Sequence, residues 1–128
     1  MTDTQAKASN FEAVLTANAV RVFSERDAAK RLLALQEIWA PDGVLYENEH
    51  VVTGIEAISL TVGALLDNLP AGTRFAPDGP VVGHHGLARL KWIAVDAAGT
   101  PGPASGIDVA FVNHGRITSL YVLLNPFG

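Results

Sequence analysis

The sequence predicts an α+β domain in which helices cover one face of a mainly antiparallel sheet. Apolar residues recur at helical spacing in the first half of the chain, up to about residue 69. From residue 73 onward the pattern changes to strand-like alternation. Residues 113–115, Asn-His-Gly, form a tight hairpin turn between the last two strand-like runs. Helices followed by hairpin-linked strands are typical of the α+β class.

The composition describes a single domain over residues 1–128, with an ordered core at about 9–125. Hydrophobic residues make up 48% and charged residues 17%, which excludes a disordered chain. A net charge of −4 argues against nucleic acid or an anionic membrane as partner. Cysteine is absent, so disulfides and thiolate metal sites are excluded. No signal peptide or membrane-spanning stretch is visible, and a cytoplasmic location is expected.

Start and stop signals define the first two helices. Ser9 and Glu12 form a capping box for the first helix. Asp27 can cap the second helix, which residues 41–43, Pro-Asp-Gly, are expected to end after Trp39. The inward positions of these helices are apolar: Phe11, Val14, Leu15, Ala19, Val22 and Phe23, then Ala28, Leu32, Leu35 and Trp39.

A third helix is predicted after a second capping box, Thr53 with Glu56. The run 69–72, Leu-Pro-Ala-Gly, ends it. Its inward residues are Ile55, Ile58, Val62, Leu65, Leu66 and Leu69.

The strands are predicted from alternation and from turn residues. They are expected at 44–48, at 73–82 with an interruption at 77–80, and at 87–95, 107–112 and 116–124, with a long hairpin loop at 97–105. The last two strands are apolar on both alternations, whereas a sheet covered on one side should show one polar face. We therefore predict a homodimer that forms through the uncovered sheet face.

Asp108 is a carboxylate within an otherwise uncharged strand, 106–112. Burial removes its hydration and raises the pKa of the carboxyl group, which is how acids and bases are tuned for work near neutral pH. A structural alternative is an Asp that faces a subunit interface or pairs with Arg89, Lys91 or Arg116. Both interpretations remain open from the residues alone.

The order of the segments resembles the nuclear transport factor two-like superfamily, in its SnoaL-like branch. The resemblance covers residues 14–124 and is carried by 38–48 (IWAPDGVLYEN), 53–58 (TGIEAI), 106–108 (GID) and 115–121 (GRITSLY). It implies a cone-shaped α+β barrel, with three N-terminal helices packed on a curved, mainly antiparallel sheet and a pocket at one end. Members include isomerases, epoxide hydrolases, dehydratases and polyketide cyclases, so the fold does not settle the function.

The ketosteroid isomerases of this superfamily imply one pair of roles. Their catalytic base lies on the first strand, where this chain has Glu47, and their protonated, hydrogen-bond-donating Asp corresponds to Asp108; that isomerase is an established example of such an arrangement. Their helix-borne oxyanion Tyr has no counterpart here, because Phe23 and its neighbours cannot donate a hydrogen bond.

Limonene epoxide hydrolase implies a different set, with a Tyr-x-Asn pair at Tyr46 and Asn48 and an activating Arg at Arg89. Two carboxylates of that enzyme are missing, since Lys91 and Val122 occupy their places. Side chains alternate along a strand, so Glu47 should point opposite to Tyr46 and Asn48 unless a bulge intervenes. The sequence leaves open which set faces the pocket.

Polyketide cyclases of this branch use an Asp and a His, which would be Asp108 with His84, His85 or His50. Adjacent His residues on a strand point to opposite faces and make a poor metal pair, and His84 and His85 fit a solvated turn. We expect no metal and no cofactor.

A hydrophobic small molecule is the expected ligand. Trp39 and Trp92 can form apolar walls or simply fill the core. Arg89 can either enter the pocket or meet acidic groups across the dimer. The predicted catalytic candidates are Asp108, Glu47, Tyr46 and Arg89, and the predicted ligand contacts are Trp39, Asn48, Trp92, Leu120 and Val122.

Two functions follow from these residues. One is a cofactor-independent isomerase, cyclase or dehydratase that transfers protons in an apolar conical pocket. The other is a non-catalytic ligand-binding or dimerisation module with the same fold.

Overall fold

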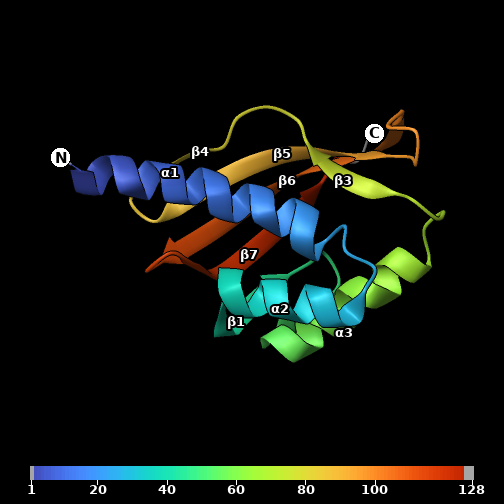
Figure 1. Cartoon of the computed structure of the whole chain (residues 1–128), viewed down its shortest axis with the longest axis horizontal. Helices are drawn as coiled ribbons and strands as arrows, with labels where there is room; N and C mark the ends of the chain where they lie inside the picture. The colour runs from blue at the N-terminus through green and yellow to red at the C-terminus, as the bar shows by residue number, and fades with distance from the viewer. Residues whose placement is uncertain (1, 126–128) are drawn as a thin grey trace.

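The computed structural model describes residues 2–125, with their side chains from residue 10 onward, and the chain folds as helices followed by strands (Figure 1). The elements in chain order are α1 (Thr2–Ala17), the π-helix η1 (Asn18–Val22), α2 (Ala28–Ile38), β1 (Trp39–Tyr46), β2 (Val51–Thr53), α3 (Ile55–Asp67), β3 (Arg74–Pro77), β4 (Val82–His84), β5 (Leu87–Val95), β6 (Pro101–Asn113) and β7 (Arg116–Leu124).

The strands form one curved, unclosed sheet in the order β2-β1-β7-β6-β5-β3, with β4 paired to β5. Strands β1 and β7 run parallel, and the other pairs are antiparallel. Helix α1 crosses one face of the sheet, and α2 and α3 pack together near β1 (Figure 1). The predicted α+β class and its cone-like arrangement are therefore confirmed.

One of the three predicted helix starts is confirmed. The Asp27 side chain accepts hydrogen bonds from the backbone N–H groups of Ala29 and Lys30, at 2.9 and 3.1 Å, and caps α2. The capping box at Ser9 was wrong, because α1 begins at Thr2 and Ser9 lies inside it; the Ser9 side chain is outside the described residues. The box at Thr53 was also wrong, since Gly54 (φ 91°) is the N-cap of α3 and Thr53 belongs to β2.

Strand β1 starts earlier than the sequence predicts. Trp39 is extended (φ −109°, ψ 151°), so the chain passes from α2 into β1 without an intervening loop, and residues 41–43 lie within the strand. Strand β6 likewise begins at Pro101, inside the predicted loop. Strands β5 and β7 have the predicted bounds. Strand β5 alternates clearly between exposed and buried residues, because one of its faces packs on the helices.

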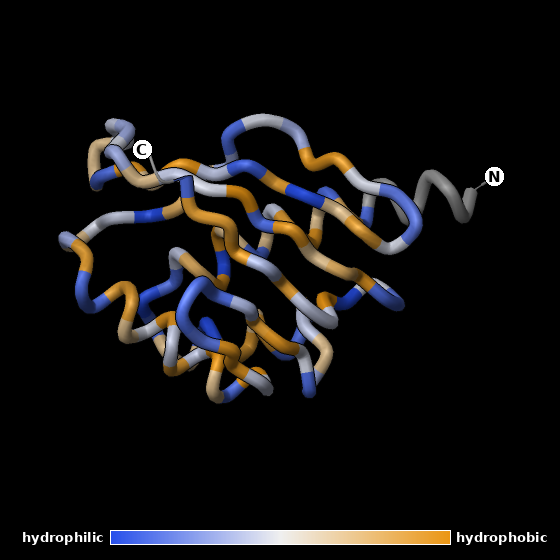
Figure 2. Tube along the Cα trace, turned by 180° about the vertical axis from the view of Figure 1, so that it is seen from behind, coloured by the Kyte–Doolittle hydropathy of each residue, from blue (hydrophilic) through white to orange (hydrophobic). Residues whose placement is uncertain are grey.

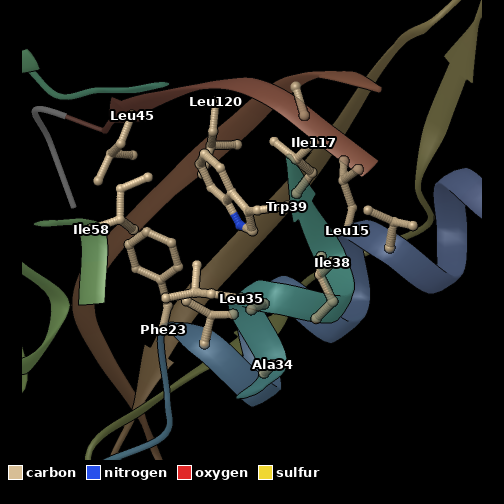
Figure 3. Packing of buried hydrophobic residues seen from close by; sticks show 14 of the residues in the cluster. Leu15, Phe23, Ala34, Leu35, Ile38, Trp39, Leu45, Ile58, Ile117 and Leu120 are labelled. Atoms are coloured by element: carbon tan, nitrogen blue, oxygen red, sulfur yellow. The ribbon is translucent and has the colours of Figure 1, made fainter. Parts of the chain in front are cut away.

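The core is built around Trp39, which is fully buried between α2 and β7 (Figure 3). Its indole Nε1 donates a hydrogen bond to Asn18 Oδ1 at 2.8 Å. Asn18 opens the π-helix, in which Phe23 N donates to Asn18 O at 3.0 Å. Asn18 and the next residue, Ala19, are both buried in this wider turn. The turn therefore supplies a hydrogen-bond acceptor for Trp39 and, beside it, an apolar side chain.

The C-terminal end of α3 is satisfied by an arginine from another part of the chain. Arg26 donates to the carbonyl oxygens of Thr73 (2.9 Å), Pro70 (3.1 Å) and Leu66 (3.4 Å). A cation at this end also complements the helix dipole. We expect Arg26→Ala to lower the free energy of unfolding by about 1 kcal/mol, measured by urea denaturation. Lys30→Ala, at an exposed position of α2, is the control, and an equal loss there would contradict this role for Arg26.

No helix within residues 2–125 combines the length and the apolar character that crossing a membrane requires.

Candidate functional site

A cavity of about 200 Å³ lies between the helices and the inner face of the sheet. Its lining is apolar except for two carboxylates, Glu47 and Asp108. The apolar lining residues are Ala19, Phe23, Leu65, Leu69, Phe75, Trp92, Ala94, Ala104, Val122 and Leu124. This combination of an apolar enclosure with very few ionisable groups is typical of small-molecule sites.

Asp108 points inward because of strand alternation. Gly106, Asp108 and Ala110 are the buried positions of this part of β6, and Asp108 stands in register between Leu90 of β5 and Val122 of β7. The proposed pairing of Asp108 with Arg89, Lys91 or Arg116 is not formed within the described residues, where the single ion pair is Arg21–Glu37. Arg116 instead donates to backbone carbonyls at the end of α2.

Trp92 holds the Asp108 carboxyl group in place. The indole Nε1 donates to Asp108 Oδ1 at 3.0 Å, and Phe75 packs edge-on against the Trp92 ring with a centroid separation of 5.2 Å. Gly106 makes this possible, because it is the β6 partner of Trp92 and a Cβ there would lie 2.5 Å from Trp92 Cζ2. In the tripeptide Gly106-Ile-Asp108, the glycine thus leaves space for the Trp92 indole, and the aspartate accepts the hydrogen bond from the indole N–H.

Burial controls the acidity of Asp108. Desolvation raises the pKa of its carboxyl group from 3.8 to about 7, and the hydrogen bond from Trp92 opposes that shift. At neutral pH the group is therefore divided between its acid and base forms. Trp92 occupies Oδ1, and no donor among the described residues bonds to Oδ2. Oδ2 is the atom that can carry the proton and offer it to a molecule in the cavity.

Glu47 lines the same cavity, at the end of β1. It lies on the same side of the strand as the fully buried Leu45, whereas Tyr46 points to the opposite face. Tyr46 stacks on Tyr121 of β7 with a centroid separation of 4.4 Å. The structure thus decides the register that the sequence left open, and it separates Tyr46 from Asp108.

Four of the predicted site residues line the cavity: Asp108, Glu47, Trp92 and Val122. The other five lie elsewhere. Arg89 is exposed on the face of β5 opposite Leu90, and Asn48 is exposed beyond β1. Trp39 and Leu120 are fully buried core residues. The template-based roles of Tyr46, Asn48 and Arg89 require these side chains to line the cavity, but none of the three is among its lining residues.

The histidines lie outside the cavity lining. His84 and His85 are exposed, and His85 lies in a turn, as the solvated-turn interpretation expects. His85 has φ 52°, and this turn brings the two Nδ1 atoms to 2.8 Å. In the described part of the chain, no group of three or more His, Asp or Glu residues is arranged to hold a metal ion.

Eight lining residues were not predicted as site residues: Ala19, Phe23, Leu65, Leu69, Phe75, Ala94, Ala104 and Leu124. Phe75 lies on the short edge strand β3, and Ala104 lies in the part of β6 that was predicted to be a loop. The only available signal for Phe75 was an aromatic residue in a short strand-like run. Its place beside Trp92 depends on the pairing of β3 with β5, where Pro77 is opposite Trp92.

The comparisons identify solved structures with the same fold. An isomerase candidate of the SnoaL-like family from Agrobacterium tumefaciens aligns over 98% of this chain and 99% of its own, with 25% identity and a TM-score of 0.74. A polyketide cyclase candidate from Sinorhizobium meliloti aligns over 90% and 97%, with 17% identity and a TM-score of 0.66. A nuclear transport factor 2-like protein of unknown function from Mesorhizobium loti aligns over 93% of both chains, with 18% identity and a TM-score of 0.64. No protein-family model matches the sequence, and no curated protein matches it significantly.

Proposed function

We propose that this chain, which has the fold of SnoaL-like and nuclear transport factor 2-like proteins, binds a hydrophobic small molecule and moves a proton on it without a cofactor. The observation that carries this proposal is the pair of carboxylates, Glu47 and Asp108, in one apolar cavity. Acid–base catalysis needs one group that accepts a proton and one that donates a hydrogen bond.

The surroundings of the two carboxylates support different roles. Asp108 is 6% exposed and is the acid with the raised pKa, so its neutral form can donate a hydrogen bond to a carbonyl oxygen. Glu47 is partly exposed at the end of β1 and is the candidate base. A carbon acid beside a carbonyl group suits this pair, because the base removes the proton from carbon while Asp108 stabilises the enolate oxygen. The reaction class is isomerisation, cyclisation or dehydration of a carbonyl compound.

Proton exchange into deuterated water tests this proposal without knowledge of the natural product. We expect the protein to catalyse exchange of the protons beside the carbonyl group of small cyclic ketones, followed by NMR. Glu47→Gln should slow exchange by about 10²- to 10⁴-fold, because general acid–base catalysis contributes about that much. Glu49→Gln, at an exposed position two residues away, is the matched control. Equal rates in Glu47→Gln and in the unaltered protein would rule out Glu47 as the base.

A non-catalytic binding module is the second candidate. It is favoured by the helical wall of the cavity, where Ala19 and Phe23 offer no hydrogen-bond donor to a developing oxyanion. In that case ketones would bind, and exchange would stay at the rate seen without protein. The same experiment therefore separates the two candidates.

We also propose that the uncovered face of the sheet pairs with a second copy of the chain. Figure 2 shows apolar segments recurring along the strands. Several outward side chains of three neighbouring strands are apolar and exposed, with Leu123 at 54%, Phe111 at 46%, Leu87 at 42% and Tyr121 at 38%, whereas Arg89 and Lys91 of β5 add positive charge to the same face. Tyr121 contacts both Tyr46 and Phe111, which makes the centre of this face aromatic. In a twofold-symmetric dimer, this apolar surface of one subunit would pack against the same surface of the other.

Charge placed on that face should prevent the pairing. We expect a dimer by sedimentation equilibrium and a monomer for Phe111→Lys, because burying an unpaired ammonium group is strongly unfavourable. Leu60→Lys is the matched control: Leu60 is 76% exposed, but it lies on α3, away from the sheet face. A monomeric unaltered protein at high concentration would refute the dimer.

A further inference from the structure

We infer that the cavity selects a compact ligand of one or two rings that carries one hydrogen-bond-accepting oxygen and no negative charge, and that it rejects both anions and four-ring skeletons. This inference rests on the proposed function, because it takes the Asp108 cavity as the ligand site. It adds the size, the charge and the polar group of the ligand.

The volume of the cavity limits the ligand. A water molecule occupies about 30 Å³ of the liquid, so a cavity of about 200 Å³ holds roughly seven water molecules. Covalently bonded atoms pack more closely, which gives a ligand of about ten non-hydrogen atoms. Sites for drug-sized molecules are about 300–1,000 Å³. A steroid or a tetracyclic polyketide is therefore too large to be enclosed by this cavity.

The walls suit a flat or ring-shaped apolar molecule. Phe23 comes from the end of the π-helix, Phe75 from β3 and Trp92 from β5, so aromatic rings face the cavity from three separate elements. The edge-on contact between Phe75 and Trp92 fixes the relative orientation of these two rings. The remaining apolar wall is aliphatic, and it includes Leu65, Leu69 and Val122.

Charge excludes an anionic ligand. No Lys, Arg or His is among the described residues that line the cavity, while Glu47 and Asp108 both are. A carboxylate or phosphate would lose its hydration and meet only like charge. The nearest basic candidate from the sequence, Arg89, faces the opposite side of the sheet. A neutral ligand avoids both costs.

The hydrogen bond from Trp92 selects the polar group of the ligand. Because the indole N–H already points at Oδ1, a proton on Asp108 sits on Oδ2, and the acid then donates to whatever lies in the cavity. A ketone or ether oxygen, or the oxygen of an alcohol, accepts such a bond. Only the protonated form of Asp108 can donate this hydrogen bond, so ligand binding is coupled to protonation of Asp108. Among the described residues, Glu47 is the only other titratable group that lines the cavity, and Trp92 is the only side chain that bonds to Asp108.

Three probes test the inference by calorimetry: the bicyclic ketone 2-tetralone, the bicyclic anion 2-naphthoate and the four-ring steroid ketone androstenedione. We expect 2-tetralone to bind, with about tenfold weaker affinity at pH 8 than at pH 6, because only the protonated fraction is competent. The Asp108→Asn variant keeps an N–H donor at this position at every pH. It should therefore bind 2-tetralone with the same affinity at pH 6 and at pH 8. The control Asp42→Asn, at an exposed position, should retain the tenfold change.

The outcomes separate this inference from the proposed function. Tighter binding of androstenedione or 2-naphthoate than of 2-tetralone would overturn the inference and leave a ligand-binding cavity in place. Binding of 2-tetralone with equal affinity at pH 6 and pH 8 would overturn the coupling to Asp108. If none of the three binds, both the inference and the proposed function fall.

Discussion

Asp108→Asn is expected to make the protein more stable at pH 8, by on the order of 3 to 4 kcal/mol, and to leave its stability nearly unchanged at pH 4. Folding raises the pKa of this carboxyl group from 3.8 to about 7, so the folded state binds the proton more tightly than the unfolded state. The stability that this proton contributes is complete below pH 3.8, declines as the pH rises from 4 to 7, and is absent above 7. Asparagine is neutral throughout, and its side-chain oxygen can still accept the Trp92 hydrogen bond.

Urea denaturation at pH 4, 5, 6, 7 and 8 measures this effect as the difference between the variant and the unaltered protein. The difference should grow by about 1.4 kcal/mol per pH unit within the window and then level off. Asp42→Asn, at an exposed position, is the control for removal of one negative charge. A difference that does not depend on pH would show that Asp108 ionises as readily in the folded state as in the unfolded state.

Gly106→Ala is expected to destabilise the protein by about 2 to 4 kcal/mol, although it adds a single methyl group. The new Cβ would lie 2.5 Å from Trp92 Cζ2 and 2.6 Å from the Leu123 carbonyl oxygen, so the indole or the β6–β7 pairing must shift. Overpacking costs about 1–3 kcal/mol, and a displaced indole leaves Asp108 without its hydrogen bond. Because that bond lowers the pKa of Asp108, its loss should raise the pKa further.

Gly102→Ala is the matched control for this second prediction. Gly102 lies on the same strand, and a Cβ there would meet its nearest neighbour, the Ala94 carbonyl oxygen, at an ordinary 3.5 Å. Thermal unfolding and near-ultraviolet circular dichroism should distinguish the two variants, with the tryptophan signal altered only in Gly106→Ala. If both variants lost the same amount of stability, the cause would be the strand propensity of the substituted residue and not the contact with Trp92.

Much of the fold could be predicted because local signals agreed with tertiary packing. Strand β5 alternates clearly, and the Asn113–Gly115 turn, with φ 52° at His114 and 76° at Gly115, is the kind of hairpin that such residues favour. Helix starts were less reliable, because a capping box is a local motif and the neighbouring sheet can override it. Thr53 pairs with Val44 in the β1–β2 ladder, so it cannot also cap α3.

The candidate site could be predicted only in part. Asp108 was conspicuous because a charge in an apolar strand must have a cause, and Trp92 followed from the same alternation on β5. Which face of β1 is covered depends on packing across the whole sheet, so Glu47 and Tyr46 could not be distinguished from a single sequence. The contributions of Phe75 and Ala104 depend on strand pairing and on the true start of β6, neither of which is encoded locally.

The π-helix links two parts of the molecule that would otherwise respond independently. Asn18 secures the indole of Trp39, while Ala19, the next residue, forms part of the cavity wall. A ligand that displaces Ala19 is therefore expected to displace Asn18 as well, and with it the hydrogen bond to Trp39, which does not line the cavity. We therefore expect the fluorescence lifetime of Trp39, measured in a Trp92→Phe variant that lacks the second tryptophan, to change when the cavity is occupied.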